Sequence, residues 1–437
     1  MNSMNQEANK PHILIYAHYY HPDVASTGQI LKELAEGLLA TFRVTVLCVV
    51  PSYHGKVDEA YTKQKYYFEE LNGVRIIRVR VPPFDKTNRS SRVKNIVAYF
   101  FRAMWATLKV PDVDYVYSIS QPPVLGGLLG CYGKIFRHAR FIYNIQDFNP
   151  EQIIATGYSK NKMILKLLAM LDKHSCKRAD KVIIVGRDMV ETLQKRFTKK
   201  NGKLSRKMPK CAFINNWIDE KEIYPLPLSH PRVDAFRKAN GLDGKYVIMY
   251  SGNLGLYYDL ENILPKLAKF PKGTVTADGR EVVFAFVGDG SIKQQLMQIK
   301  EEKQMDNVVF IPYQDKADLI YSLNAADAHW CVSAKGIKGV SVPSKLYGAI
   351  ATARPILAVL EEGAEARLIV EETKCGLLST PCDYEAMLTN LQALLDIAGS
   401  EEEKAMGERG RDYLVKHLTK DVSIAKYTDE ILAIPKR

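Results

Sequence analysis

The chain alternates short, continuous apolar runs with longer stretches in which apolar residues recur every three or four positions. Continuous runs of four to eight apolar residues are typical of strands buried on both faces, and the wider spacing is typical of amphipathic helices. Their alternation predicts parallel sheets built from β-α-β units. The expected strands are 12–17, 44–50, 74–81, 115–120, 141–146, 182–185, 211–215, 246–250, 282–287, 308–311, 328–332 and 355–360.

Helical spacing follows most of these strands. Ser26 or Thr27 is the expected N-cap of the first helix, because a hydroxyl there accepts from an unpaired N–H group of the first turn. The remaining expected helices are 89–110, 124–136, 163–171, 189–197, one after Gly290, a short helix after Ser344, 384–397, 401–417 and 420–434.

The alternating pattern is interrupted once. Three prolines between residues 225 and 231 indicate a linker, and a second series of strands and helices begins at Tyr246. A chain of 437 residues is also too long for one ordinary core. We therefore expect an α/β fold with one domain over 1–220, joined by a returning helix at about 418–437, and a second domain over 221–417.

Small polar loops end several strands of the second half. Gly252 and Asn253 follow one strand, and Gly288 and Asp289 follow the next. The carboxyl ends of parallel strands share one edge of a sheet, which is where open α/β sheets bind ligands. Glycine lets the backbone approach a ligand closely. Three glycine-bearing loops at one edge, the third at 339–343, favour a nucleotide site.

The third loop leads through Ser341 into a short helix with Ser344 and Lys345 at its start. The first N–H groups of a helix carry partial positive charge, and Lys345 adds a full one, so this segment suits a diphosphate. The alternative is an ordinary serine cap beside a solvated lysine.

Two positions in the first half lie at predicted strand ends. Gly28 stands near the start of the first helix, where it either faces a ligand or only eases helix–strand packing. Asp147 follows the strand 141–146 and is a candidate for catalysis or for binding a hydroxyl. The alternative for Asp147 is a turn aspartate bonded to its own backbone.

Charge and cysteine content bear on partners and location. The formal net charge is +12, from 61 Lys and Arg against 49 Asp and Glu, which favours acidic partners such as nucleotides or phospholipid headgroups. The seven cysteines are scattered and form no C-x-x-C pair, and we find neither a secretory signal nor an apolar run of about 20 residues. These features favour a cytoplasmic setting. The helix 89–110 has an aromatic, apolar face with basic flanks. This face either packs on the core or contacts an anionic membrane surface.

Six motifs in order carry a resemblance to a known family. They are HYYHPDVASTGQ near the start, IQDFNPE at 145–151, INNWID at 214–219, YSGNLG at 250–255, FVGDG at 286–290 and VPSKLYGAIATARPILAV at 342–359. Over most of the chain they resemble the family-4 retaining glycosyltransferases, in particular bacterial enzymes that build capsule, O-antigen or exopolysaccharide units, such as N-acetyl-fucosamine and fucose transferases.

The resemblance implies a GT-B fold, in which two Rossmann-like domains face each other across a cleft and the C-terminal helix crosses back to the first. It implies a nucleotide-sugar donor, most simply UDP-linked, on the second domain, and a saccharide or polyprenyl-diphosphate-linked acceptor on the first. No metal or cofactor is expected, and neither is nucleic acid as a partner. Asp147 and Lys345 would be the catalytic residues. The implied donor-binding residues are Gly28, Gly252, Asn253, Gly288, Asp289, Ser341, Ser344, Lys345 and Tyr347, and the implied acceptor-binding residues are His18, Gln121, Asp147 and Glu151.

The chain departs from the family pattern in two places. The paired glutamates of many members fall on Val340 and Gly348, so Tyr347 or Asp289 would have to contact the ribose instead. The basic residue that often follows the G-x-L loop is also absent, which leaves the phosphates to Lys345 or to Lys335 and Lys338. Two alternative functions stay open at this point: a nucleotide-sugar epimerase of the same architecture, and a non-catalytic nucleotide-sugar-binding subunit.

Overall fold

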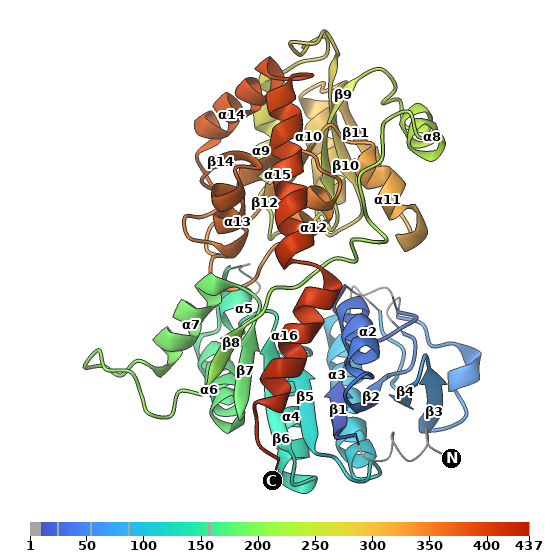
Figure 1. The fold of residues 1–437 in the computed structure, drawn as a ribbon, viewed down its shortest axis with the longest axis vertical. Coiled ribbons are helices and arrows are strands. Elements are labelled where there is room, and N and C mark those ends of the chain that lie inside the picture. The colour runs from blue at the N-terminus through green and yellow to red at the C-terminus, as the bar shows by residue number, and fades with distance from the viewer. Residues whose placement is uncertain are drawn as a thin grey trace. The chain divides into compact units, whose positions relative to one another are not determined.

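The computed structural model describes residues 10–23, 26–52, 55–85, 88–155, 157 and 159–436. Contacts between Cα atoms divide the chain into two compact units, residues 1–215 with 421–437, and residues 216–420. The division therefore falls five residues before the expected boundary at 220, and the returning segment starts three residues later than expected. Each unit is an α/β structure with its own sheet (Figure 1).

The first unit holds a sheet in the order β3-β4-β2-β1-β5-β6-β7-β8. All neighbouring strands are parallel except β3, which pairs antiparallel with β4 at the edge. The strands are β1 (His12–Tyr16), β2 (Arg43–Val49), β3 (Tyr66–Leu71), β4 (Val74–Val79), β5 (Tyr115–Ile119), β6 (Arg140–Ile145), β7 (Lys181–Ile184) and β8 (Cys211–Phe213).

Helices cover both faces of this sheet. They are α2 (Ser26–Leu38), α3 (Arg89–Thr107), α4 (Leu125–Phe136), α5 (Glu151–Ala155), α6 (Lys162–Arg178), α7 (Arg187–Phe197) and α16 (Lys420–Leu432), with a 3-10 turn at Glu59–Tyr61. Helices α3, α4 and α6 cover one face of the sheet. Tyr143 of β6 points to this face, and its hydroxyl donates to Asp172 of α6 at 2.6 Å. The next residue, Asn144, points to the other face and donates to the Tyr427 hydroxyl of α16 at 3.0 Å. The C-terminal helix therefore packs on the sheet of the first unit (Figure 1).

The second unit holds an all-parallel sheet in the order β11-β10-β9-β12-β13-β14. Its strands are β9 (Tyr246–Ser251), β10 (Val282–Val287), β11 (Val308–Ile311), β12 (Ala328–Val332), β13 (Ile356–Val359) and β14 (Gly376–Ser379). Its helices are α8 (Pro231–Ala239), α9 (Leu260–Ile263), α10 (Lys293–Glu302), α11 (Lys316–Asn324), α12 (Lys345–Ala351), α13 (Glu365–Thr373), α14 (Tyr384–Asp396) and α15 (Glu401–His417), with a 3-10 segment at Leu264–Lys269.

Strand order locates the ligand edge of each sheet. In both sheets three parallel strands lie on one side, β1, β2 and β4 or β9, β10 and β11. The chain then returns to the other side of the first strand, so the order reverses between β1 and β5 and between β9 and β12. Open α/β sheets bind ligands beyond the carboxyl ends of the strands at such reversals. The segments that follow these four strands are therefore the places to look for a site.

Every expected strand is present, with ends that agree to within two residues. Two strands were missed, β3 and β14, because β3 (YYFEEL) carries two glutamates at an exposed edge and β14 (GLLS) has only two large apolar residues. Helices α5, α8, α9, α11 and α13 were also missed. The linker prediction was wrong at its end, since Pro231 occupies the first turn of α8, where its lack of an N–H has no cost.

Candidate functional site

Two glycine-bearing loops meet at the carboxyl edge of the second sheet. The Gly252 N–H donates to the Val287 carbonyl at 2.8 Å, and the Leu254 N–H donates to the Asp289 carbonyl at 2.9 Å. A third contact ties in the segment after β12, since the Ala334 N–H donates to the Tyr257 carbonyl at 2.7 Å. The structure thus brings the loops after β9, β10 and β12 together.

The close approach depends on glycine. Gly252 and Gly288 have φ values of +138° and +136°, a region that side chains rarely tolerate. A Cβ on Gly288 would lie 2.1 Å from the Gly252 carbonyl oxygen, and a Cβ on Gly252 would lie 2.5 Å from Cε of Lys345. The expected donor residues Gly252, Gly288 and Lys345 are therefore in direct contact.

The Lys345 side chain lies over Gly252 in an aromatic slot. Its Nζ is 3.4 Å from the centre of the Tyr258 ring and 5.2 Å from that of Tyr250. Burial lowers the pKa of Lys345 to about 7, and the nearby Cys331 thiol opposes this shift without cancelling it. A diphosphate would supply the negative charge that this amine lacks, so the slot suits an anion.

The other expected donor residues lie around this slot. Asn253, Asp289 and Ser344 are exposed. Ser344 is the N-cap of α12, but its side chain makes no capping hydrogen bond, so the hydroxyl is not committed to the helix. The Ser341 N–H closes a turn onto the Ile337 carbonyl at 3.4 Å, in the segment that leads into α12.

Tyr347 is an exception among the expected donor residues. Its ring is almost completely buried in a core cluster with Ile320, Leu323 and Ile350. The next residue, Gly348, faces Leu323, whose Cδ1 would lie 3.3 Å from an added Cβ. This segment of α12 is packed against apolar side chains, which argues against the expected contact of Tyr347 with a ribose.

Lys338 does not join Lys345. An added Cβ on Gly363 would lie 2.8 Å from the Lys338 Nζ, which places this amine beside the loop after β13. The N–H groups of Gly336 and Lys338 both donate to the Glu361 carboxylate at 2.9 Å, so this carboxylate orders the loop backbone.

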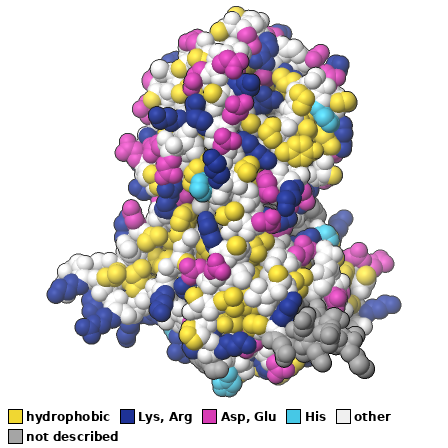
Figure 2. All heavy atoms as spheres, viewed as in Figure 1, with side chains coloured by type: hydrophobic (Ala, Val, Ile, Leu, Met, Phe, Trp, Pro, Cys, Tyr) yellow, Lys and Arg dark blue, Asp and Glu magenta, His cyan; other side chains and the backbone are white. Residues whose placement is uncertain are grey.

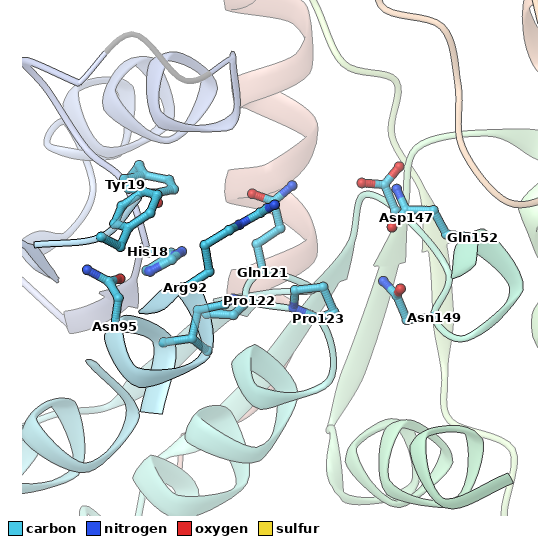
Figure 3. Close-up of a pocket in the computed structure, with 12 residues that line it drawn as sticks. His18, Tyr19, Arg92, Asn95, Gln121, Pro122, Pro123, Asp147, Asn149 and Gln152 are labelled. Carbon is cyan, nitrogen blue, oxygen red and sulfur yellow. The ribbon is translucent and has the colours of Figure 1, made fainter. Parts of the chain in front are cut away.

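The first unit contains a cavity of about 380 Å³ at the carboxyl edge of its sheet (Figure 3). It lies at the reversal between β1 and β5 and extends to the loop after β6. The expected residues His18, Gln121 and Asp147 all line it. The other lining residues are Tyr19, Phe84, Arg92, Asn95, Ile96, Pro122, Pro123, Asn149 and Gln152.

Two buried polar atoms of this cavity have no hydrogen-bond partner among the described residues: Nε2 of His18 and Oδ1 of Asn149. These side chains are only 6% and 3% exposed. Burial lowers the pKa of His18 to about 4, although a hydrogen bond with Asn95 opposes this shift, so the imidazole is neutral at pH 7. Buried polar atoms are rarely left unpaired, so the cavity is suited to a ligand with hydroxyl groups.

The segment that carries Asp147 is held on two sides. The Ser120 hydroxyl accepts from the N–H groups of Gln146 and Asp147 at 3.1 and 3.2 Å. From α7, Arg196 donates to the Asn149 carbonyl at 2.7 Å and lies 4.4 Å from the centre of the Phe148 ring. The backbone on both sides of Asp147 is therefore fixed.

Glu151 does not line the cavity, which corrects its expected role in acceptor binding. Its carboxylate accepts from Nε of Arg196 at 2.9 Å, and Arg196 also pairs with the buried Asp172. Glu151 thus belongs to the ion-pair network that supports the Asp147 segment.

Gly28 lies in the first turn of α2 and is also absent from the cavity lining. A Cβ there would lie 3.2 Å from the Tyr19 carbonyl oxygen, so glycine allows the loop after β1 to pass close to the helix. The neighbouring Thr27 hydroxyl donates to Oε1 of Gln121 at 2.9 Å and joins the loops after β1 and β5.

Sequence reasoning missed Arg92, Asn95, Asn149 and Gln152. Asn95 gave no signal in the sequence, because it lies on the buried face of α3 with Tyr99 and Ala103, opposite the apolar stripe that the sequence shows. Asn149 lies inside the IQDFNPE motif but was not assigned.

No group of three or more His, Cys, Asp or Glu with metal-binding geometry occurs among the described residues.

Matches to known protein families extend over most of each unit. Residues 232–413 match the glycosyl transferases group 1 family, and residues 27–201 match the glycosyl transferase 4-like domain. The chain is a glycosyltransferase.

Relatives and solved structures agree with this assignment. The glycosyltransferase is 29% identical over 353 residues to the probable glycosyltransferase WbjE of Pseudomonas aeruginosa, covering 79% of this chain and 82% of WbjE. It is also 24% identical over 401 residues to WcaI of Escherichia coli (strain K12), a putative colanic acid biosynthesis glycosyl transferase. This match covers 88% of this chain and 92% of WcaI.

The glycosyltransferase also shares its fold with solved structures. Sucrose-phosphate synthase from Thermosynechococcus elongatus superposes with a TM-score of 0.73 at 15% identity, over 98% of this chain and all of that one. Anabaena Alr3699/HepE in complex with UDP-glucose superposes with a TM-score of 0.67 at 14% identity, over 97% and 99%. The two parallel-sheet units and these neighbours show the GT-B fold expected from the sequence.

Proposed function

We propose that this glycosyltransferase moves a sugar from a nucleotide-diphosphate donor, most simply UDP-linked, to a saccharide or a lipid-linked saccharide in the synthesis of a bacterial surface polysaccharide. The observation that carries the proposal is the contact of Gly252, Gly288 and Lys345 at the carboxyl edge of the second sheet. The names of WbjE and WcaI, and the UDP-glucose bound by HepE, support the donor and acceptor classes.

In this proposal the second unit binds the donor. Backbone N–H groups of the glycine loops and the Lys345 ammonium would offset the charge of the diphosphate, as Mg²⁺ does in other enzymes. No metal is therefore required. The exposed Asp289 and Asn253 are placed to contact the nucleoside, and Ser344 to donate to a phosphate oxygen.

The cavity of the first unit would bind the acceptor. The neutral His18 offers Nε2 and Asn149 offers Oδ1, so the pair suits sugar hydroxyl groups. Asp147 would orient the attacking hydroxyl and stabilise positive charge at the anomeric carbon. The bond from that carbon to the phosphate oxygen breaks, the acceptor oxygen bonds the carbon from the same face, and its proton passes to the leaving phosphate. The anomeric configuration is retained.

The first test identifies the donor. A ligand that binds only the folded state must raise the melting temperature, so one of a panel of UDP-, GDP- and dTDP-sugars should give a shift of several degrees. The donor found should form a glycosidic product of retained configuration by NMR when an acceptor saccharide is present. Isomerisation of the nucleotide sugar without acceptor would instead show an epimerase, and binding without any turnover would show a non-catalytic subunit.

The second test concerns Asp147. The change Asp147→Asn keeps the shape of the side chain but removes its charge, and we expect kcat to fall by at least about a hundredfold. Asp112→Asn is the matched control, since Asp112 is exposed outside the cavity. Near-normal turnover of a folded Asp147→Asn enzyme would exclude Asp147 from the reaction.

A further inference from the structure

The first unit exposes an apolar surface on one helical layer. Helix α4 packs between α3 and α6 on the same face of the sheet. The outward side chains of these three helices are mostly large and apolar. On α3 they are Val93, Val97, Phe101, Trp105 and Leu108, on α4 Ile135 and Phe136, and on α6 Met163, Ile164, Leu167 and Met170.

The exposure is high for residues of this type. Trp105 is 67% exposed and Met163 is 82% exposed. On α3 and α6 the spacing of three or four places these residues on one side, and on α4 the two lie together in its last turn. Single exposed apolar residues need no explanation, but stripes on neighbouring helices mark an interaction site.

The charge of this layer has one sign. Helices α3, α4 and α6 contain a single carboxylate, Asp172, which is buried and paired with Arg196. Their exposed charged residues are all basic: Arg92, Lys94, Lys162, Lys166, Lys177 and Arg178. By contrast, Figure 2 shows acidic and basic side chains interspersed on the face where α16 covers the sheet.

We infer that the α3, α4 and α6 layer docks on an anionic lipid bilayer, so that the acceptor is taken from that membrane. Exposed aromatic and aliphatic side chains flanked by basic residues enter the headgroup region, where anionic lipids balance the charge. A second copy of the chain fits less well, because a symmetric contact would bring two basic layers together.

Helix α3 links this surface to the acceptor cavity. Arg92, Asn95 and Ile96 line the cavity, while Val93 and Val97 in the same turns are exposed. An acceptor saccharide attached to a lipid would thus reach the cavity along α3. The inference rests on the proposed function and names the carrier of its acceptor. No described helix is long and apolar enough to cross a membrane, so docking would be on the surface only.

Tryptophan fluorescence gives a direct test. Of the three tryptophans, Trp217 and Trp330 are buried, so a shift on adding vesicles reports Trp105. The full chain should bind vesicles of phosphatidylcholine with 30% phosphatidylglycerol at least about tenfold better than pure phosphatidylcholine. Its emission should shift to the blue, and 0.5 M NaCl should weaken binding.

Variants separate the two contributions. Phe101→Ser with Trp105→Ser, and Met163→Ser with Leu167→Ser, should each weaken co-flotation by about tenfold or more. Lys94→Gln with Lys166→Gln should weaken binding by roughly tenfold to thirtyfold, at about fivefold per basic side chain. Val275→Ser with Met297→Ser is the matched control on the second unit and should bind normally.

Three results would overturn the inference. They are no co-flotation at low salt, vesicle binding that none of the layer variants changes, and a dimer that Phe101→Ser with Trp105→Ser dissociates. Nucleic-acid binding without vesicle binding would likewise replace the membrane as partner. Transfer to a water-soluble acceptor tests the proposed function separately, since it should persist in every layer variant.

Discussion

Donor binding should depend on pH through one amine, that of Lys345. Its pKa of about 7 in the free protein means that half of the molecules carry a neutral Lys345 at pH 7. A diphosphate next to Nζ favours the charged form and raises this pKa. Donor binding should therefore be accompanied by proton uptake, which removing the amine in Lys345→Met abolishes.

The size of the effect follows from linkage. If only the charged form binds, affinity for the donor is constant below about pH 6 and falls about tenfold per pH unit above pH 7, until the pKa of the complex is reached. The surrounding groups do not titrate in this range, since burial raises the pKa of Cys331 to about 12 and that of Tyr250 well above its usual value. Proton uptake should rise from near zero at pH 6, through about one half at pH 7, to nearly one proton at pH 8.

Calorimetry between pH 6 and pH 9 measures both quantities, when each titration is repeated in two buffers of different ionisation enthalpy. The ligand should be the nucleotide sugar with the largest thermal shift, because its diphosphate is a diester without a pKa near neutrality. Lys345→Met should weaken binding at pH 6 by about ten- to a hundredfold, the loss of one charge-assisted contact of about 1.5–3 kcal/mol. It should also leave binding independent of pH.

Lys303→Met, on an exposed position at the end of α10, is the matched control and should behave like the wild type. The free Lys345→Met protein should also be more stable than the wild type at pH 7. A lysine with a lowered pKa destabilises the fold below that pKa, and the penalty disappears only as pH rises toward 10.4. Donor affinity that is flat from pH 6 to pH 9 without proton uptake would refute the assignment of Lys345.

Two further predictions concern the supports of the two sites. Arg196→Met leaves Asp172 and Glu151 without their partner, and we expect a loss of about 3–5 kcal/mol in the free energy of unfolding at pH 7, measured by urea titration, that shrinks at acid pH as Asp172 is protonated. An unchanged denaturation midpoint would show that the network does not hold the Asp147 segment. Gly288→Ala should cost about 2 kcal/mol or more and abolish the thermal shift with donor, because the new Cβ collides with the Gly252 carbonyl. Gly279→Ala, at φ +82° with nothing within 4 Å, has only the backbone strain and should still bind donor. Equal effects of the two changes would contradict the close packing of the loops.

The sheets could be predicted from the sequence because parallel strands buried on both faces are continuous apolar runs. The run from Tyr246 to Tyr250, for example, is apolar throughout and predicts a buried strand. Strand β3 gave no such signal, since it is an antiparallel edge strand with no buried residue, and two of its six residues are glutamates. Helix α8 was hidden because its first turn begins with a proline, a residue that also marks linkers.

The candidate sites could be predicted only in part. Positions fixed by the ends of strands, such as Gly252, Gly288 and Asp147, could be found because strand order determines the edge on which they lie. Glu151 was misassigned because its partner Arg196 lies 45 residues further along the chain. The aromatic slot around Lys345 was also missed, since Tyr258 is 87 residues away in sequence and only the folded structure places its ring beneath Nζ.

The structure of the protein in complex with its nucleotide sugar tests the central claim most directly. The account predicts the diphosphate within hydrogen-bonding distance of Lys345 Nζ and of the backbone N–H groups in the loops that carry Gly252 and Gly288. A diphosphate bound elsewhere, with the Lys345 amine still confined between Tyr250 and Tyr258, would contradict it.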